Sequence, residues 1–123
     1  MKTILLVESD VGFLFWFGQG LAQAGYAVIP ARSVPDAEAL LGEPQIAVDL
    51  LIVNPALPDT AGFVETLRSL NHRLKVVAVT DNQAEPGQIP DVEFRFQKPE
   101  RTDEVTRQEL IAQIERVSPL AAN

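Results

Sequence analysis

Short apolar runs alternate with helix-forming segments along this chain, and that alternation restricts its fold more than any other feature of the sequence. The apolar runs are rich in Val, Ile and Leu, as is typical of strands buried on both faces of a sheet. We expect strands at Ile4–Val7, Tyr26–Pro30, Val48–Val53, Lys75–Val79 and Val92–Phe96. Strands that alternate with helices form a parallel sheet with helices on both faces, so the sequence predicts a doubly wound α/β fold.

Capping residues mark the helices between these strands. Asp10 and Ser33 are good N-cap residues, Gly25 is a good stop, and Thr106–Glu109 forms a capping box. We expect helices from Asp10 to about Ala24, from Ser33 to about Leu41, over Gly62–Leu70, and from Thr106 to about Val117.

Two segments depart from this regular pattern. Residues 81–91 hold two prolines and a glycine, so we expect a loop there with at most one helical turn. The strand after it has charged residues alternating outward, which indicates an edge strand. We expect one domain over residues 1–123, with a tail that frays from about residue 118.

The charge and the rare residues exclude several kinds of site. The chain has 17 Asp and Glu against 10 Lys and Arg, a net charge of -7, which disfavours nucleic acid and anionic membrane surfaces as partners. It has no cysteine, which excludes disulfides, thiolate zinc sites and thiol catalysis, and the single His72 excludes a multi-histidine metal site. A chain without cysteine leans toward the cytosol, and we expect a cytoplasmic protein.

One uncharged segment has the length of a membrane span. The 21 residues Val11–Ala31 carry no charge. They include two glutamines, four glycines and a proline, and no basic segment precedes them. We therefore expect neither a membrane span nor a signal peptide.

Polar residues follow the expected strands at their carboxyl ends, where open α/β sheets bind their ligands. This position nominates a site made of Glu8, Ser9, Asn54, Thr80 and Lys98.

These residues and their surroundings resemble the receiver domain of bacterial two-component response regulators. The resemblance covers nearly the whole chain and is carried by four motifs in order: Ile4–Asp10, Asp49–Gly62, Val79–Thr80 and Lys98–Pro99. It implies a flavodoxin-like fold with a five-stranded parallel sheet in the order 2-1-3-4-5. It also implies a role in phosphorelay signalling.

The chain departs from the family at the reacting positions. Asn54 stands where the resemblance implies a phosphoaccepting aspartate, and Ser9 where it implies an acidic magnesium ligand. An amide nitrogen is a poor nucleophile, and Pro55 lacks the N–H through which Asn54 could deamidate. Magnesium gives up its waters mainly to carboxylates and phosphate. We therefore expect no phosphoryl transfer and weak or absent magnesium binding, with Glu8 and Asp10 as the weak metal candidates.

We expect the polar groups of the pocket to pair with one another instead of binding a metal or a phosphoryl group. Counted as Glu8 and Lys98, its charge sums to zero, so Lys98 should pair with Glu8 while Asn54 and Thr80 complete the hydrogen bonds. Such an ion pair specifies a structure more than it stabilises one. Asp10 is interpreted as a helix cap rather than a metal ligand.

The switch face that the resemblance implies is also altered. Thr80 and Lys98 are 18 positions apart, several fewer than is usual in the family, so the fourth helix should be shortened or missing. Arg95 stands where the family often has an aromatic switch residue, and Pro99 lies beside it on this face. Residues 100–105 resemble an insertion before the last helix.

The first helix has aromatic residues that its core-facing side does not explain. Phe13, Phe17 and Leu21 share one face, while Phe15 lies nearly opposite and Trp16 lies at the boundary. Trp16 can be half covered by the core, but an outward Phe15 cannot. Phe15 and Trp16 are therefore candidates for a homodimer or partner surface.

These observations favour a stand-alone, phosphorylation-independent pseudo-receiver that acts through a protein partner such as a signalling kinase or effector. We expect no cofactor and no enzyme activity, because no nucleophile and base form a pair. The alternatives are a receiver that uses Asp59 or Ser9 as a non-standard acceptor, and a module that binds a small anion near Lys98.

Overall fold

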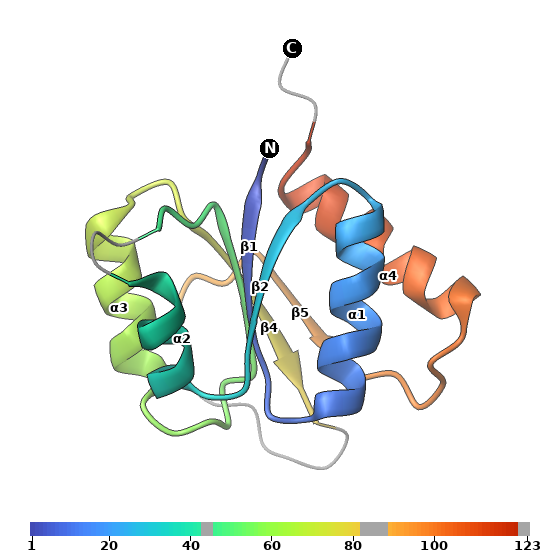
Figure 1. Ribbon diagram of the computed structural model, residues 1–123, viewed down its shortest axis with the longest axis horizontal. Helices are drawn as coiled ribbons and strands as arrows, with labels where there is room; N and C mark the ends of the chain where they lie inside the picture. The colour runs from blue at the N-terminus through green and yellow to red at the C-terminus, as the bar shows by residue number, and fades with distance from the viewer. Residues whose placement is uncertain (43–45, 82–88, 121–123) are drawn as a thin grey trace.

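The computed structural model describes residues 1–42, 46–81 and 89–120, which form a sheet between two layers of helices (Figure 1). The elements in chain order are β1 (Thr3–Val7), α1 (Val11–Gln23), β2 (Ala27–Ala31), α2 (Val34–Leu41), β3 (Leu50–Val53), α3 (Thr60–Leu70), β4 (Lys75–Thr80), β5 (Phe94–Gln97) and α4 (Glu104–Val117). All neighbouring strands are parallel, and their order is β2-β1-β3-β4-β5. The predicted doubly wound sheet in the order 2-1-3-4-5 is confirmed.

Each face of the sheet has its own hydrophobic core. α1 and α4 cover one face, and α2 and α3 cover the other (Figure 1). Alternation along β1 divides its side chains: Ile4 and Leu6 face α1 and α4, whereas Leu5 and Val7 face the opposite core. β1, β3 and β4 are buried on both faces, which explains why they read as continuous apolar runs.

The first two helices begin where their caps were predicted. The Asp10 carboxylate accepts a hydrogen bond from the Phe13 N–H at 3.2 Å, and the Ser33 hydroxyl accepts from the Asp36 N–H at 3.1 Å. α3 begins at Thr60, two residues earlier than predicted.

The start of the last helix was predicted wrongly. α4 begins at Glu104, because the Asp103 carboxylate accepts from the Thr106 N–H at 2.8 Å. Asp103 is as good an N-cap as Thr106, and it places an acidic residue in the first turn, where the helix dipole favours it. Glu104 and Val105 therefore belong to α4, and the predicted insertion is shorter than residues 100–105.

The segment between β4 and β5 lies only partly within the described residues. The helix predicted to be shortened or missing falls on residues 82–88, which lie outside them. Residues 89–93 are described and are not helical. β5 is an edge strand, as predicted.

The end of α4 is packed where fraying was predicted. Ser118 is buried, and its carbonyl accepts a hydrogen bond from the Tyr26 hydroxyl at 2.7 Å. Burial, and to a smaller extent the nearby Glu115 carboxylate, raise the pKa of Tyr26, so the donor stays protonated. The prediction of a tail that frays from about 118 is wrong for Ser118, and residues 121–123 lie outside the described part of the chain.

The uncharged run Val11–Ala31 is divided between two elements. α1 occupies its first part and β2 its last part, with a turn at Gly25, whose φ is 111°. None of the helices in the described residues is long and apolar enough to cross a bilayer.

Candidate functional site

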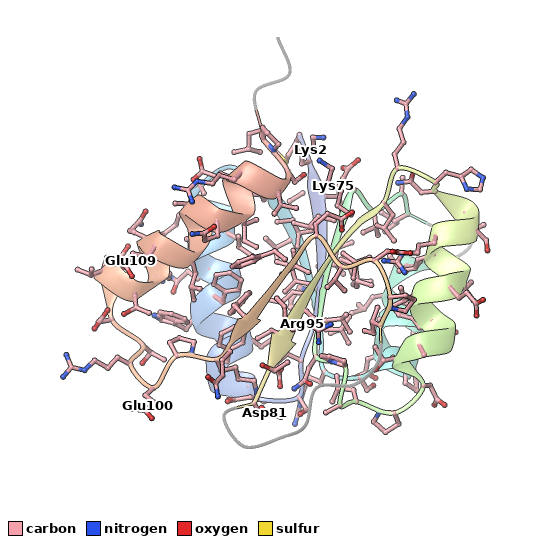
Figure 2. The ribbon with its side chains drawn as sticks, turned by 180° about the vertical axis from the view of Figure 1, so that it is seen from behind. Lys2, Lys75, Asp81, Arg95, Glu100 and Glu109 are labelled. Carbon is pink, nitrogen blue, oxygen red and sulfur yellow. The ribbon has the colours of Figure 1, made fainter. Side chains whose placement is uncertain are left out.

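The carboxyl ends of four strands bring a small polar cluster together. Glu8 follows β1, Asn54 follows β3, Asp81 follows β4 and Lys98 follows β5. In Figure 2, Asp81 lies at this end of the sheet, while Lys2 and Lys75 lie at the opposite end. The parallel register aligns the strand ends, and the Asn54 N–H donates to the Val7 carbonyl at 3.1 Å.

Glu8 is a fully buried carboxylate with three hydrogen-bond donors. Its side chain is 0% exposed. Oε1 accepts from Lys98 Nζ at 2.8 Å and from the Asp10 N–H at 3.1 Å, and Oε2 accepts from Asn54 Nδ2 at 3.0 Å. A buried charge is tolerated when it is paired and hydrogen-bonded in this way.

The Asn54 amide links two carboxylates. Nδ2 donates to Glu8 Oε2 at 3.0 Å and to Asp81 Oδ2 at 3.3 Å, while Oδ1 accepts from the Ala56 N–H at 2.9 Å. The orientation of the amide follows from chemistry, because carboxylates only accept and a backbone N–H only donates. Both amide hydrogens are therefore committed to acids.

Lys98 is the cation of the cluster. Nζ lies 2.8 Å from Glu8, 2.6 Å from Asp81 and 3.8 Å from Asp10, and also stands 5.9 Å from the centre of the Phe13 ring. Burial, the largest single influence, lowers the pKa of Lys98. The hydrogen bonds and charges of Asp81 and Glu8 together outweigh it, so the pKa is raised above its ordinary 10.5.

The same contact acts in the opposite direction on the acid. The hydrogen bond from Lys98, aided by one from Asn54, lowers the pKa of Asp81 below its ordinary 3.8, although desolvation opposes the change. A depressed acid pKa stabilises the fold above 3.8 and loses that contribution as the pH falls through the folded-state value. A raised lysine pKa stabilises the fold below 10.5 and loses its contribution as the pH rises beyond it.

We expect Asp81→Asn to lower the free energy of unfolding by at most about 1 kcal/mol, because solvent screens this half-exposed pair. The difference from the wild type should stay constant at neutral pH and close as the pH falls below 3.8. Urea unfolding at stepped pH measures it. A difference that persists or widens in acid would mean that the Asp81 carboxylate contributes nothing as an anion.

The structure brings together three of the five nominated residues and separates two. Glu8, Asn54 and Lys98 meet, and the predicted Lys98–Glu8 pair is confirmed. The Thr80 hydroxyl instead donates to the Phe96 carbonyl at 3.4 Å, so its predicted place in the pocket network is wrong, and it ties two strand ends together. Ser9 is exposed, and no hydrogen bond among the described residues joins its hydroxyl to the cluster.

Sequence reasoning missed Asp81. The predicted strand ended at Val79, so the strand-end rule nominated Thr80. β4 runs one residue further, to Thr80, and Asp81 is the residue that directly follows it. The predicted charge balance is consequently wrong. Three carboxylates, those of Glu8, Asp10 and Asp81, lie within 4 Å of Lys98 Nζ, which gives a formal charge of -2. The side chains of Asp10 and Asp81 are about half exposed, so water solvates these two carboxylates and screens much of their charge.

The cluster does not fit a magnesium ion, which the resemblance to receiver domains implies. Lys98 Nζ already occupies the point where the carboxylates converge, and both Glu8 oxygens hold donors. Asn54 turns its nitrogen toward the acids and commits its oxygen to a backbone N–H. Among the residues that the structure describes, no group of His, Asp and Glu side chains is arranged to hold a metal.

A cleft of about 580 Å³ opens beside this cluster. Asp10, Phe13 and Trp16 of the α1 side and Lys98 and Pro99 after β5 contribute to its walls. Trp16 packs against Phe13 with ring centres 6.0 Å apart. Arg95 is exposed on β5 and is labelled in Figure 2.

The two residues nominated together as an interface lie on different surfaces. Trp16 is partly buried in the cleft beside Lys98. Phe15 is 72% exposed and lines a separate groove between α1 and β2. Adjacent helix residues point about 100° apart, so the single surface that the sequence suggested is corrected to two.

Comparisons with solved structures agree with the observed fold. No protein-family model matches the chain, and no curated protein matches it. Among solved structures, the non-phosphorylated HemR receiver domain from Leptospira biflexa is 23% identical with a TM-score of 0.74, over 100% of this chain and 98% of that one. The chemotaxis response regulator CheY4 of Vibrio cholerae is 21% identical with a TM-score of 0.73, over 95% and 98%.

A further match is also a receiver domain. The receiver domain protein (CheY-like) from Methanospirillum hungatei is 23% identical with a TM-score of 0.70, over 94% of this chain and 92% of that one. The TM-scores show that the architecture is shared. Identities this low say nothing about the chemistry of the site, which has to be argued from the residues of this chain. The chain has the fold of the response regulator receiver domains.

Proposed function

We propose that the chain is a phosphorylation-independent signalling module of the receiver fold, acting in a two-component or phosphorelay context through contacts with other proteins. The observation that carries this proposal is the Asn54 amide, which donates both of its hydrogens to the carboxylates of Glu8 and Asp81. Because both hydrogens are held in this way, the Asn54 side chain links the ends of neighbouring strands.

The chemistry of Asn54 supports this proposal. Its nitrogen lone pair is delocalised into the amide, so it cannot attack phosphorus as a carboxylate can. Its oxygen accepts from the Ala56 N–H, and its nitrogen faces anions that would repel a phosphoryl donor. No oxygen of this residue is available as a nucleophile.

The proposal extends to the metal and to catalysis. Lys98 and the Asn54 amide hold Glu8 and Asp81 together, a task that otherwise needs a divalent cation between acids. The module would then need no magnesium to keep its pocket intact. The clustered carboxylates have no nucleophilic partner in the described residues, which supports a binding module without turnover.

The resemblance to receiver domains supports a protein partner and a cytoplasmic location. Receiver domains work with signalling kinases and effectors, and we propose a protein partner of that kind in the cytoplasm. A small-anion ligand is less favoured, because an anion at Lys98 would lie against the carboxylates of Glu8, Asp10 and Asp81.

The alternative acceptors remain part of the test. Asp81 carries a carboxylate beside Lys98, whereas Asp59 and Ser9 are exposed, and in the described part of the chain neither makes a hydrogen bond to the cluster. Incubation with magnesium and acetyl phosphate should leave the intact mass of the wild-type chain unchanged. An adduct of one phosphoryl group would overturn the proposal, and peptide mapping would show which of the three residues carries it.

A matched variant shows that the donor works under these conditions. Asn54→Asp replaces the side-chain amide with a carboxylate and changes nothing else. A phosphoryl adduct on this variant would show that acetyl phosphate is an active donor under these conditions. A second readout uses beryllofluoride with magnesium and the amide NMR spectrum. Saturable shifts near Asn54 and Lys98 in the wild type would show that the pocket still accepts a phosphoryl-like group.

A further inference from the structure

An apolar groove of about 350 Å³ lies between α1 and β2. β2 is an edge strand of the sheet (Figure 1). None of the residues that line the groove belongs to the Lys98 cluster. The α1 residues that line it include Val11, Phe15, Gly18 and Ala22, and the β2 residues are Val28 and Pro30. Phe15 is 72% exposed and Val11 is 51% exposed, so large apolar side chains stand at its rim.

The α1 residues of the groove form a regular stripe. Val11, Phe15, Gly18 and Ala22 follow one another at spacings of four, three and four, the pattern of a seam between two packed helices. The two bulky residues lie in the first half of the stripe, and the two small residues in the second half. An identical helix laid antiparallel across it places Phe15 over the other copy's Gly18, and Val11 over the other copy's Ala22.

Packing within the chain does not require the glycine of this stripe. A Cβ on Gly18 would lie 3.7 Å from Leu6 and 3.8 Å from Val28, which are ordinary contacts. A Cβ on Gly20, by contrast, would lie 2.6 Å from Arg107 Cδ, so α4 requires that glycine. A glycine in the interior of a helix makes that helix less stable than an alanine at the same position would. The hollow at Gly18 therefore suits a neighbour from outside the chain.

The occupant of the groove is restricted by the edge of β2. The Ala27 N–H donates to the Lys2 carbonyl and the Ala31 carbonyl accepts from the Glu8 N–H, so these two residues face β1. Alternation turns Pro30 outward, where it offers no N–H to an added strand. A helix is thus favoured over a strand.

Charge narrows the choice to a second copy. The groove belongs to the Val11–Ala31 run, which carries no charge in a chain of net charge -7. In a two-fold symmetric contact each patch faces itself, so an acidic patch would repel its copy and an uncharged patch does not. A partner of opposite charge would gain nothing from this surface.

We propose that the groove between α1 and β2 is the interface of a homodimer, in which the α1 helices cross antiparallel and each Phe15 packs over the other copy's Gly18. This inference rests on the proposed function, since it names the partner surface of a module that signals without a phosphoryl group. Because the contact is apolar and the copies are both acidic, salt strengthens it by screening their repulsion.

Sedimentation analysis of the full chain tests the dimer. The wild type should dimerise at about 0.1 mM, and more tightly as NaCl is raised. Phe15→Glu should weaken the dimer at least about tenfold, because it puts two like charges into the seam. Val105→Glu is the matched control: Val105 is 70% exposed but lies on α4, and its variant should dimerise like the wild type.

A compensating pair tests the antiparallel arrangement. Val11→Ala should weaken the dimer, and adding Ala22→Val should restore it, because the exchange only reverses which copy supplies the bulk. Both side chains are exposed, so the variants should fold.

Three results would overturn the inference: a wild-type chain that is monomeric at about 0.1 mM, a dimer that Phe15→Glu leaves intact, or a double variant that restores nothing. None of them bears on the phosphoryl-transfer test, which reads mass and not association. A phosphoryl adduct on a chain that still dimerises through Phe15 would overturn the proposed function alone.

Discussion

Lys98→Met is expected to lower the free energy of unfolding by about 3 kcal/mol at neutral pH. Within the described part of the chain, Lys98 is the cation that pairs with Glu8, at 2.8 Å, and the Glu8 side chain is 0% exposed. Removing one partner of a buried pair leaves the other charged and unpaired, which costs far more than the pair contributes. Asp81 and Asp10 also lose their counter-charge. Urea unfolding at neutral pH measures the loss.

Lys75→Met provides the control for this variant. Lys75 lies at the opposite end of the sheet (Figure 2), is exposed, and donates to the Val117 carbonyl at 2.7 Å. Its removal should cost less than about 1 kcal/mol. The double variant Glu8→Gln with Lys98→Met should recover most of the loss, because it leaves no buried charge. If Lys98→Met were no more harmful than Lys75→Met, the cluster would not depend on its central cation.

Local physics accounts for what could be predicted of the fold. The central strands are apolar because both faces are covered, and Asp10 and Ser33 cap the helices next to them. These signals lie within a few residues of the elements they determine. The end of α4 at Val117 was predicted, but the packing of Ser118 after it was missed, because it depends on a contact between Tyr26 and Ser118, which are 92 positions apart.

The site was partly predictable for the same reason. The strand-end rule placed Glu8, Asn54 and Lys98 together, because parallel strands end at one edge of the sheet. It could not tell which way a side chain turns there. Thr80 turns toward the Phe96 carbonyl and Asp81 turns toward Lys98, although they are neighbours in sequence.

The second large effect is expected from Asn54→Asp, which should lower the free energy of unfolding by about 3 kcal/mol at neutral pH when no divalent cation is present. The variant loses two hydrogen bonds to carboxylates. It puts a new carboxylate oxygen about where Nδ2 now lies, 3.0 Å from Glu8 Oε2 and 3.3 Å from Asp81 Oδ2. The new carboxylate joins those of Glu8, Asp10 and Asp81, so four acids then share one lysine, and like charges at this distance repel.

The repulsion gives this variant two signatures that the wild type should lack. Millimolar magnesium should restore about 1–2 kcal/mol, because a cation that binds the folded acids stabilises the fold by mass action. Lowering the pH should also narrow the deficit, since a proton on one carboxyl removes a like charge. The wild type, held by an amide and an ammonium, should show no response to magnesium in the same thermal or urea unfolding series.

Asn71→Asp separates the loss of an amide from the crowding of acids. Asn71 Nδ2 donates to the Val48 carbonyl at 2.9 Å, so the same substitution removes one hydrogen bond at a site where, among the described residues, the amide donates to no carboxylate. It should cost about 1–2 kcal/mol and be indifferent to magnesium. If Asn54→Asp behaved the same way, the amide would not be the link between Glu8 and Asp81. If the wild type itself gained stability with magnesium, Lys98 and Asn54 would not have taken the place of the metal, and the basis for a phosphorylation-independent module would fail at its first step.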